Sequence, residues 1–379
     1  MADNPRSSAS LKLARSVLVA ALALWGLFPA NADEPGPIAD IFARASINSD
    51  RGGVVGFGAT AHRIGGRDVR LRFAMERSRD DTRFNFAYRS QGDPDRNPRL
   101  SLSAFVIQSQ AGSVYGFDSM SARIEPRLNW RMGEHSTFTS YVSVSRGEIS
   151  NVSAMTSQII RNDAGSRIQT AIGAIYNWRQ RGEAGGRPAY GLNLRGELGR
   201  SDRGHEYASA TARSSVAWSP SGEDGFILRA QVKAGAVRSL QGASHIGDRF
   251  LLGQSSLRGF ELGGFGPRDL SVADVPALGG NNYLVARFDA QFPTAFGSGS
   301  WIQPGLFVDI GSLWGLDDTA GGVAGANPVN DTAQLNGSVG VSVRIETGIG
   351  NLNVSVASPF ASQVQDRLQQ VQFSFNHDF

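Results

Sequence analysis

The sequence predicts an all-β protein, a closed antiparallel transmembrane β-barrel of about 16 strands. Three observations predict it. The chain begins with an export signal, most of it alternates between apolar and polar residues with a period of two, and its last strand ends on an aromatic residue. Together they place the chain in the bacterial outer membrane as an integral protein.

The first 32 residues have the pattern of a secretory signal peptide. Basic residues precede an apolar run from Ser16 to Ala30, and Ala30-Asn31-Ala32 has the small-x-small form of a cleavage site. The run is shorter than the ~20 residues that a membrane-spanning helix needs. We expect cleavage before Asp33; the alternative is a buried N-terminal helix.

Composition excludes several classes of protein. The formal net charge is +3 over 379 residues, and this near balance argues against nucleic acid as a partner, because phosphate contacts need a basic surface. The absence of cysteine excludes thiol chemistry and cysteine-based metal sites. The 46 glycines and the clusters of turn-forming residues fit many short strands joined by turns.

Alternation with a period of two is the main structural signal. Apolar residues fall on one face and polar or charged residues on the other in segments 170–178, 192–198, 226–237, 282–292 and 339–346. The polar faces carry both signs of charge, as a wet lumen allows, and no helical pattern interrupts the strands. Within a membrane only helices and closed barrels pair every backbone group. At ~9–11 residues a strand, the length allows roughly 14–18 strands.

The predicted domain organisation is simple. Residues 1–32 are the signal peptide, 33–52 a short periplasmic leader, and 53–379 the barrel, with the first strand near Val54. Within the leader, residues 37–46 are expected to form a turn of helix. Residues 317–334 hold few large apolar side chains and are expected to form a mobile external loop.

The last strand is a sharp local signal. Phe373, Phe375 and Phe379 alternate with polar residues, and the chain ends on the last of them. An alternating final strand with a terminal aromatic resembles the C-terminal targeting signal of bacterial outer-membrane proteins. Chance alternation in a soluble edge strand is the alternative.

A connection of about 45 residues precedes the strand at 282–292. Loops this long are usually functional or disordered, and this one carries the apolar residues of an ordered loop. It contains F-L-L-G-x-x-S-L-R-G-F at 250–260 and G-P-R-D at 266–269, followed by G-G-N at 279–281 and F-V-D-I-G-x-L-W at 307–314. Residues 249–379 therefore resemble the barrel of the BamA/TamA-like assembly and translocation family (the bacterial surface antigen superfamily).

The resemblance implies a loop that folds back into the lumen. The loop motif falls on Leu257, Arg258, Gly259 and Phe260, and its arginine is expected to contact acidic residues of the barrel wall. By position these are Asp289 and Asp309; a guanidinium can hold a carboxylate by two parallel hydrogen bonds. The alternative is a solvated loop arginine.

Two features depart from the family pattern. The family's POTRA domains, which recruit client chains, have no room before the expected first strand, and segment 347–352 lacks the family's two prolines. The first departure puts the full assembly role in doubt. Separately encoded periplasmic partners are one way in which the role could persist.

No catalytic set is evident. The five histidines lack metal-ligand spacing, and no G-x-S-x-G elbow precedes a helix, so we expect neither an enzyme, nor a metal site, nor a cofactor.

The preferred function is to assist the insertion or translocation of proteins at the outer membrane. Its partners would be membrane lipid and unfolded barrel or secreted clients. The alternatives are a passive pore lined by Arg195, Arg229, Lys233, Arg287 and Arg344, and a family relative without assembly activity.

Overall fold

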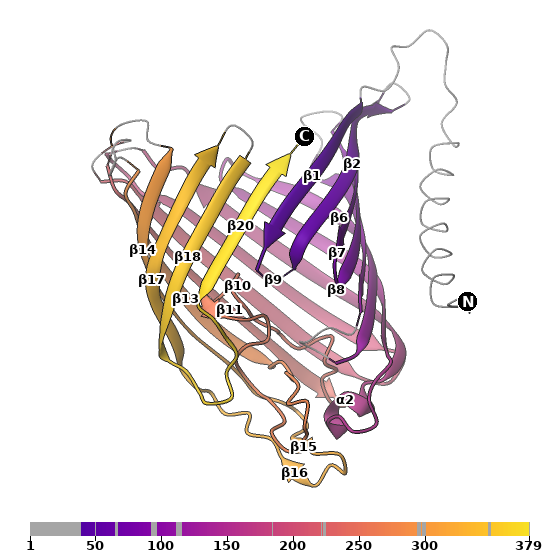
Figure 1. Cartoon of the computed structure of the whole chain (residues 1–379). Coiled ribbons are helices and arrows are strands. Elements are labelled where there is room, and N and C mark those ends of the chain that lie inside the picture. Colours follow the sequence, from indigo (N-terminus) through magenta and orange to yellow (C-terminus); the bar gives the residue numbers. More distant parts are fainter. Residues whose placement is uncertain are drawn as a thin grey trace, which may run out of the picture.

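Sixteen strands form one closed antiparallel barrel, in which each barrel strand pairs with the next in the chain and the last pairs with the first (Figure 1). The computed structural model describes residues 39–49, 51–64, 67–91, 97–110, 116–183, 185–220, 222, 225–293, 297, 301–347 and 350–378. The predicted fold class and strand number are confirmed. The expected signal peptide, residues 1–32, lies outside the described residues.

The barrel wall follows the order of the chain. Its strands are β1 (Ala39–Asn48), β2 (Gly52–Ile64), β3 (Arg67–Ser78), β4 (Asp81–Ser90), β5 (Arg99–Ser109), β6 (Asp118–Met132), β7 (Ser136–Ser150), β8 (Gly165–Gln180), β9 (Ala189–Ser201), β10 (Glu206–Trp218), β11 (Ile227–Gln241), β13 (Asn282–Gln291), β14 (Ile302–Trp314), β17 (Asn336–Thr347), β18 (Gly350–Ala361) and β20 (Val371–Asp378). Outside the wall lie α2 (Gln158–Asn162), β12 (Gly259–Phe260), β15 (Ala320–Gly321), β16 (Asn327–Pro328) and β19 (Leu368–Gln369). Among the described residues, no helix is long and apolar enough to span a membrane.

The barrel starts earlier than expected. Strand β1 lies inside the segment predicted to be a leader, and it pairs with β2 over its whole length, from Ala39 opposite Ala61 to Asn48 opposite Gly52. The predicted first strand near Val54 is therefore the second strand, and the turn of helix expected at 37–46 is wrong where that segment is described. The alternation in β1 rests largely on alanines, so its strand state depends on pairing with β2.

The two faces of the wall differ as the alternation predicted. On β13, Leu284 and Phe288 point outward and are 51% and 47% exposed, whereas Val285 between them is fully buried on the lumen side. On β14, Leu306 is exposed while Asp309, on the opposite face, is buried. The outward face thus offers an apolar surface to lipid, and the charged side chains line the lumen.

Long connections gather at one end of the barrel. Residues 151–164, 242–281, 315–335 and 362–370 all lie there, together with α2, β15 and β16 (Figure 1). In outer-membrane barrels the longer loops face the cell exterior. The loop expected to be mobile, 317–334, is folded in the structure, since β15 pairs with β16 and Val329 is buried.

The junction between the first and last strands is the shortest ladder described in the wall. It joins five residue pairs, from Arg44 opposite Asp378 to Asn48 opposite Ser374. By contrast, β1 and β2 share ten pairs. Within the part of the chain that the structure describes, the segment 39–43 of β1 pairs with β2 alone. We call this junction the seam.

Candidate functional site in the barrel lumen

The connection between β11 and β13, residues 242–281 and here called the lumen loop, is a packed structure. Leu257 and Phe260 are both fully buried. They belong to an apolar cluster with Leu252, Phe265, Val285 and Leu313, so the loop packs against β13 and β14. The motif residues of the loop therefore sit in its core, at the inner surface of the wall.

Arg258 binds the wall through Asp309. Its Nε donates to Oδ2 at 2.7 Å and its Nη2 to Oδ1 at 2.6 Å, which forms a two-bond fork. The backbone N–H of Arg258 also donates to Oδ2, at 3.0 Å. Charge-assisted, bidentate bonds of this kind are the strong ones. Asp309 fixes both the backbone and the side chain of the loop at this point.

A second carboxylate and an aromatic ring complete the surroundings of Arg258. Its Nη1 donates to Asp289 Oδ1 at 2.6 Å, and its Cζ lies 3.7 Å from the centre of the Phe307 ring. The Nε of Arg287 is 3.5 Å from Asp309 Oδ1. Two arginines therefore meet two carboxylates, so the charge of this buried group is balanced. The structure brings together the three residues that the sequence analysis singled out, Arg258, Asp289 and Asp309.

Gly259 lets the loop lie against the next strands. Its φ is +90°, in the left-handed region, and a Cβ there would lie 3.1 Å from the Cβ of Ala357 and 3.4 Å from that of Ser338. Ser338 Oγ donates to the carbonyl oxygen of Arg258 at 2.6 Å. Glycine at this motif position thus allows a close approach that a larger residue would disturb.

The lumen loop also reaches the strand that forms the seam. Strand β12 of the loop pairs with β19, just before β20. Gln372, on β20, donates from Nε2 to the carbonyl oxygen of Phe260 at 3.3 Å. The backbone N–H of Glu261 donates to the carbonyl oxygen of Arg367 at 3.1 Å. The loop is therefore bonded to the C-terminal side of the seam.

Two cations hold the tip of the loop. The carbonyl oxygen of Ser255 accepts from Lys233 Nζ at 2.8 Å and from Arg287 Nη1 at 3.0 Å. The sequence analysis placed Lys233 and Arg287 on the lumen face but gave them no partner. The partner that they share is a backbone carbonyl oxygen, which no side-chain pattern identifies.

A further anchor, near the start of the loop, was missed from the sequence. Asp248 accepts from Arg167 on β8 through a two-bond fork at 2.5 and 2.8 Å. Nearby, burial raises the pKa of Asp163 to about 6. Burial, and then the charge of Arg167, lower the pKa of His245 to about 4. Asp248 stands beside the recognised motif F-L-L-G, but nothing local pointed to its partner on a strand some 80 residues away.

A second network lies on the wall formed by β6 to β10. Glu197 accepts from Arg123 at 2.5 and 3.3 Å and from the hydroxyls of Tyr141 and Tyr207, each at 2.8 Å. The Tyr207 ring lies over Gly199 of the neighbouring strand β9, where a Cβ would come within 2.4 Å of the ring. Alternation placed Glu197 on the lumen face, but its partners come from three other strands.

The predicted C-terminal signal is only partly described. Phe373 is 38% exposed on the outward face of β20, and Phe375 lies opposite Ile47 in the seam. Phe379 lies outside the described residues. The role of these residues in targeting stays a prediction. In the described part of the chain, no three His, Cys, Asp or Glu residues gather in a way that could hold a metal ion.

The fold and the site define a class of protein, an integral outer-membrane β-barrel whose lumen holds an inward-folded loop bound to the wall by an arginine. The chain belongs to the Omp85 superfamily, since the family model of the Omp85 superfamily domain matches residues 64–379. The resemblance drawn from residues 249–379 is therefore confirmed.

Known proteins resemble the chain to different extents. The outer membrane protein assembly factor BamA of Neorickettsia risticii (strain Illinois) is 29% identical over 154 residues, which are 40% of this chain and 20% of that protein. Among solved structures, BamA from Haemophilus ducreyi lacking POTRA domains 1–3 has a TM-score of 0.76 at 18% identity, covering 91% of this chain and 71% of that one. CdiB from Escherichia coli has a TM-score of 0.55 at 13% identity, with coverages of 92% and 64%. The structural matches establish the fold.

Proposed function

We propose that this barrel assists the insertion or translocation of other proteins at the outer membrane. The seam is the observation that carries the proposal, because its ladder is the shortest in the described wall, with five residue pairs and two further bonds between Ser49 and Phe373. Membrane lipid would surround the barrel, and the clients would be unfolded barrel or secreted chains. Separately encoded periplasmic proteins are the partners that would deliver them. The curated relative named above is called an assembly factor, and the aligned region spans 20% of its length.

The mechanism follows from the edge of β1. Residues 39–43 pair with β2 on one side, and on the other side no described residue of β20 pairs with them. An unpaired edge of a strand is a template on which another extended chain can add by backbone hydrogen bonds. A client strand would begin to pair there and then replace β20 along β1, pair by pair. The process is physical, with no covalent step.

The lumen loop would keep the other side of the seam in place. It is bonded to β14 through Asp309, to β17 through Ser338 and to β20 through Gln372. These bonds tie the last strands to one buried structure while β1 separates from them. Arg258 thus acts as a positioning residue in the proposal, with Asp289 and Asp309 as its wall partners.

Reconstitution tests the proposal. The purified mature chain is placed in liposomes, and the folding of a second, urea-unfolded outer-membrane barrel is followed with empty liposomes, wild type, Arg258→Ala and Arg79→Ala. Arg79 is the control, because its side chain is 90% exposed on the turn between β3 and β4. We expect wild type and Arg79→Ala to accelerate folding and Arg258→Ala to do so less.

A folded wild type that gives no acceleration would remove the autonomous insertase. Of the five cations named for the pore alternative, Arg195 and Arg287 pair with carboxylates. Arg344 instead donates to the neutral Asn353 Oδ1 at 3.2 Å, which is the kind of contact that the pore alternative needs. Steady, anion-selective conductance in the same liposomes, without faster client folding, would favour that alternative.

A further inference from the structure

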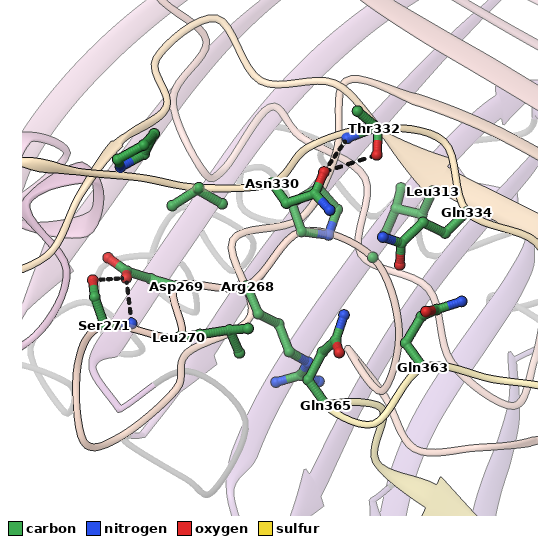
Figure 2. Close-up of a pocket in the computed structure, with 14 residues that line it drawn as sticks. Arg268, Asp269, Leu270, Ser271, Leu313, Asn330, Thr332, Gln334, Gln363 and Gln365 are labelled. Atoms are coloured by element: carbon green, nitrogen blue, oxygen red, sulfur yellow. Dashed lines mark hydrogen bonds between the residues drawn. The ribbon is translucent and has the colours of Figure 1, made fainter.

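A pocket opens among the long connections at the loop-rich end of the barrel. Its volume is about 470 Å³, within the range of roughly 300–1,000 Å³ usual for small-molecule sites. Three stretches of chain meet there: residues 266–271 of the lumen loop, residues 328–334 before β17, and residues 363–365 before β19. Figure 2 shows side chains from all three stretches turned toward one space.

Arg268 is the unusual group in this pocket. It is only 4% exposed, and it donates to two backbone carbonyl oxygens, those of Gly263 and of Val275. Its Nε is buried without a hydrogen-bond partner. Among the described residues, no carboxylate lies within salt-bridge distance of its guanidinium. Burial, and then the charge of Arg367, lower its pKa to about 10. The carboxylates of Asp366 and Glu261 raise this pKa in part, but neither forms an ion pair with the guanidinium. A buried charge without a direct ion-pair partner costs free energy, which a bound anion would offset.

Two of the nearby carboxylates, those of Asp269 and Asp366, are engaged elsewhere. Asp269 accepts from the backbone N–H of Ser271 at 3.0 Å and from that of Gly322 at 2.6 Å. Figure 2 shows its side chain turned to Ser271. Asp366 accepts from the backbone N–H of Gln363 at 2.7 Å and from Asn336 Nδ2 at 2.6 Å. Neither forms an ion pair with Arg268.

The rest of the lining is suited to a hydroxylated molecule. Three glutamines, Gln334, Gln363 and Gln365, line the pocket together with Arg268 (Figure 2). Asn330 uses its Oδ1 on the backbone and hydroxyl of Thr332, at 3.1 and 2.8 Å, so its amide NH₂ is the group left to donate. Primary amides both donate and accept, which matches the hydroxyls of a sugar.

We infer that this pocket binds the oxyanion of a small hydroxylated molecule, a phosphorylated or acidic sugar, with Arg268 holding the charged group. The planar guanidinium matches the oxygen spacing of phosphate and of carboxylate. The longer loops of an outer-membrane barrel face the exterior, so such a ligand would come from the cell surface or the medium. The inference does not depend on the proposed function.

Calorimetric titration of the purified barrel tests the inference. The probes are inorganic phosphate, glucose 6-phosphate, glucuronate and, as the neutral control, glucose. We expect saturable binding of at least one sugar anion and none of glucose. Tighter binding of glucose 6-phosphate would identify phosphate as the preferred group, and tighter binding of glucuronate would identify carboxylate. No saturable binding of either sugar anion at millimolar concentrations, or equal binding of glucose, would overturn the inference.

Three variants connect binding to Arg268. Arg268→Gln removes the charge. Gln365→Glu places a carboxylate in the lining of the same pocket, where it competes with a bound anion. The control Arg79→Gln replaces an exposed arginine by glutamine at the same end of the barrel. We expect the first two to weaken anion binding by about tenfold or more and the third to leave it unchanged. Gln365→Glu keeps the test valid if Arg268→Gln misfolds, because it removes no buried group. Wild-type affinity in a folded Gln365→Glu variant would contradict the role of Arg268.

Discussion

The backbone N–H and the guanidinium of Arg258 both donate to the carboxylate of Asp309, through three bonds of 2.6 to 3.0 Å. One wall residue therefore fixes the path of the loop as well as the rotamer of its arginine. Asp309 is fully buried, so these bonds replace all of its water. This dependence makes the pair the first place to test the lumen loop.

Replacing Arg258 by alanine should destabilise the barrel, because the buried Asp309 loses its two bonds to the guanidinium and keeps only the backbone N–H of the loop and the longer contact with Arg287 at 3.5 Å. We expect the free energy of unfolding to fall by about 3–5 kcal/mol at most, and by less if water enters the gap. Arg258→Lys should give an intermediate loss, since lysine keeps the charge and loses the fork. Urea titration followed by tryptophan fluorescence measures both, with Arg79→Ala as control. Equal midpoints for all four proteins would contradict a structural role for the pair.

A disulfide across the seam should stop the proposed activity. Ile47 and Phe375 lie directly opposite each other, and the natural chain has no cysteine to interfere. We expect the oxidised Ile47→Cys/Phe375→Cys protein to lose client-folding activity and to regain it on reduction. The control joins β1 to its other neighbour, through Ala45→Cys with Val55→Cys, and should stay active when oxidised. Full activity of the oxidised seam variant would show that the seam need not open.

Two glycines on β9 should respond differently to the same substitution. A Cβ at Gly199 would lie 2.4 Å from the Tyr207 ring, whereas a Cβ at Gly196 meets nothing within 4 Å. Gly199→Ala should displace Tyr207 from Glu197 and lower the free energy of unfolding by about 1–3 kcal/mol. Gly196→Ala should have little effect. Thermal unfolding in detergent compares the stability of the two variants. Similar losses of stability would mean that the contact of Tyr207 with Gly199 does not determine the effect of the substitution.

His245 should make the barrel less stable in mild acid. Its pKa of about 4 lies below the ordinary 6.5, so as the pH falls through this interval the unfolded chain takes up a proton that the folded protein does not. The expected loss is at most ~1.4 kcal/mol per pH unit. Asp163, whose pKa is raised to about 6, acts in the opposite direction, because it takes up its proton in the folded state first.

The comparison of wild type with His245→Gln isolates the histidine, because Asp163 is present in both proteins. Urea unfolding at several pH values between 4 and 6.5 should show the difference between them changing with pH. A constant difference over that range would mean that His245 is not kept neutral by its surroundings.

The alternation of side chains predicted most of the wall, because in a membrane barrel the lipid face and the lumen face differ at every second residue. The alternation did not predict strand β1, because alanines such as Ala43 and Ala45 are only weakly hydrophobic and so mark its apolar face poorly. The partners of Arg258 were predicted from a resemblance together with the polar face of a strand. The contacts of the anchors Arg167 and Lys233 could not be predicted, because their partners belong to the lumen loop and depend on where that loop lies inside the closed wall.

The position of the lumen loop also constrains how the chain can fold. The loop ends at residue 281, yet the groups that hold Arg258 and Phe260 come from later strands, at Asp309, Ser338 and Gln372. Strands β2 to β10 can form as successive local hairpins, whereas the loop reaches its final contacts only with strands that follow it in the chain. Enclosing the loop and completing the last part of the wall are therefore one cooperative event, whose long-range contacts favour slow formation.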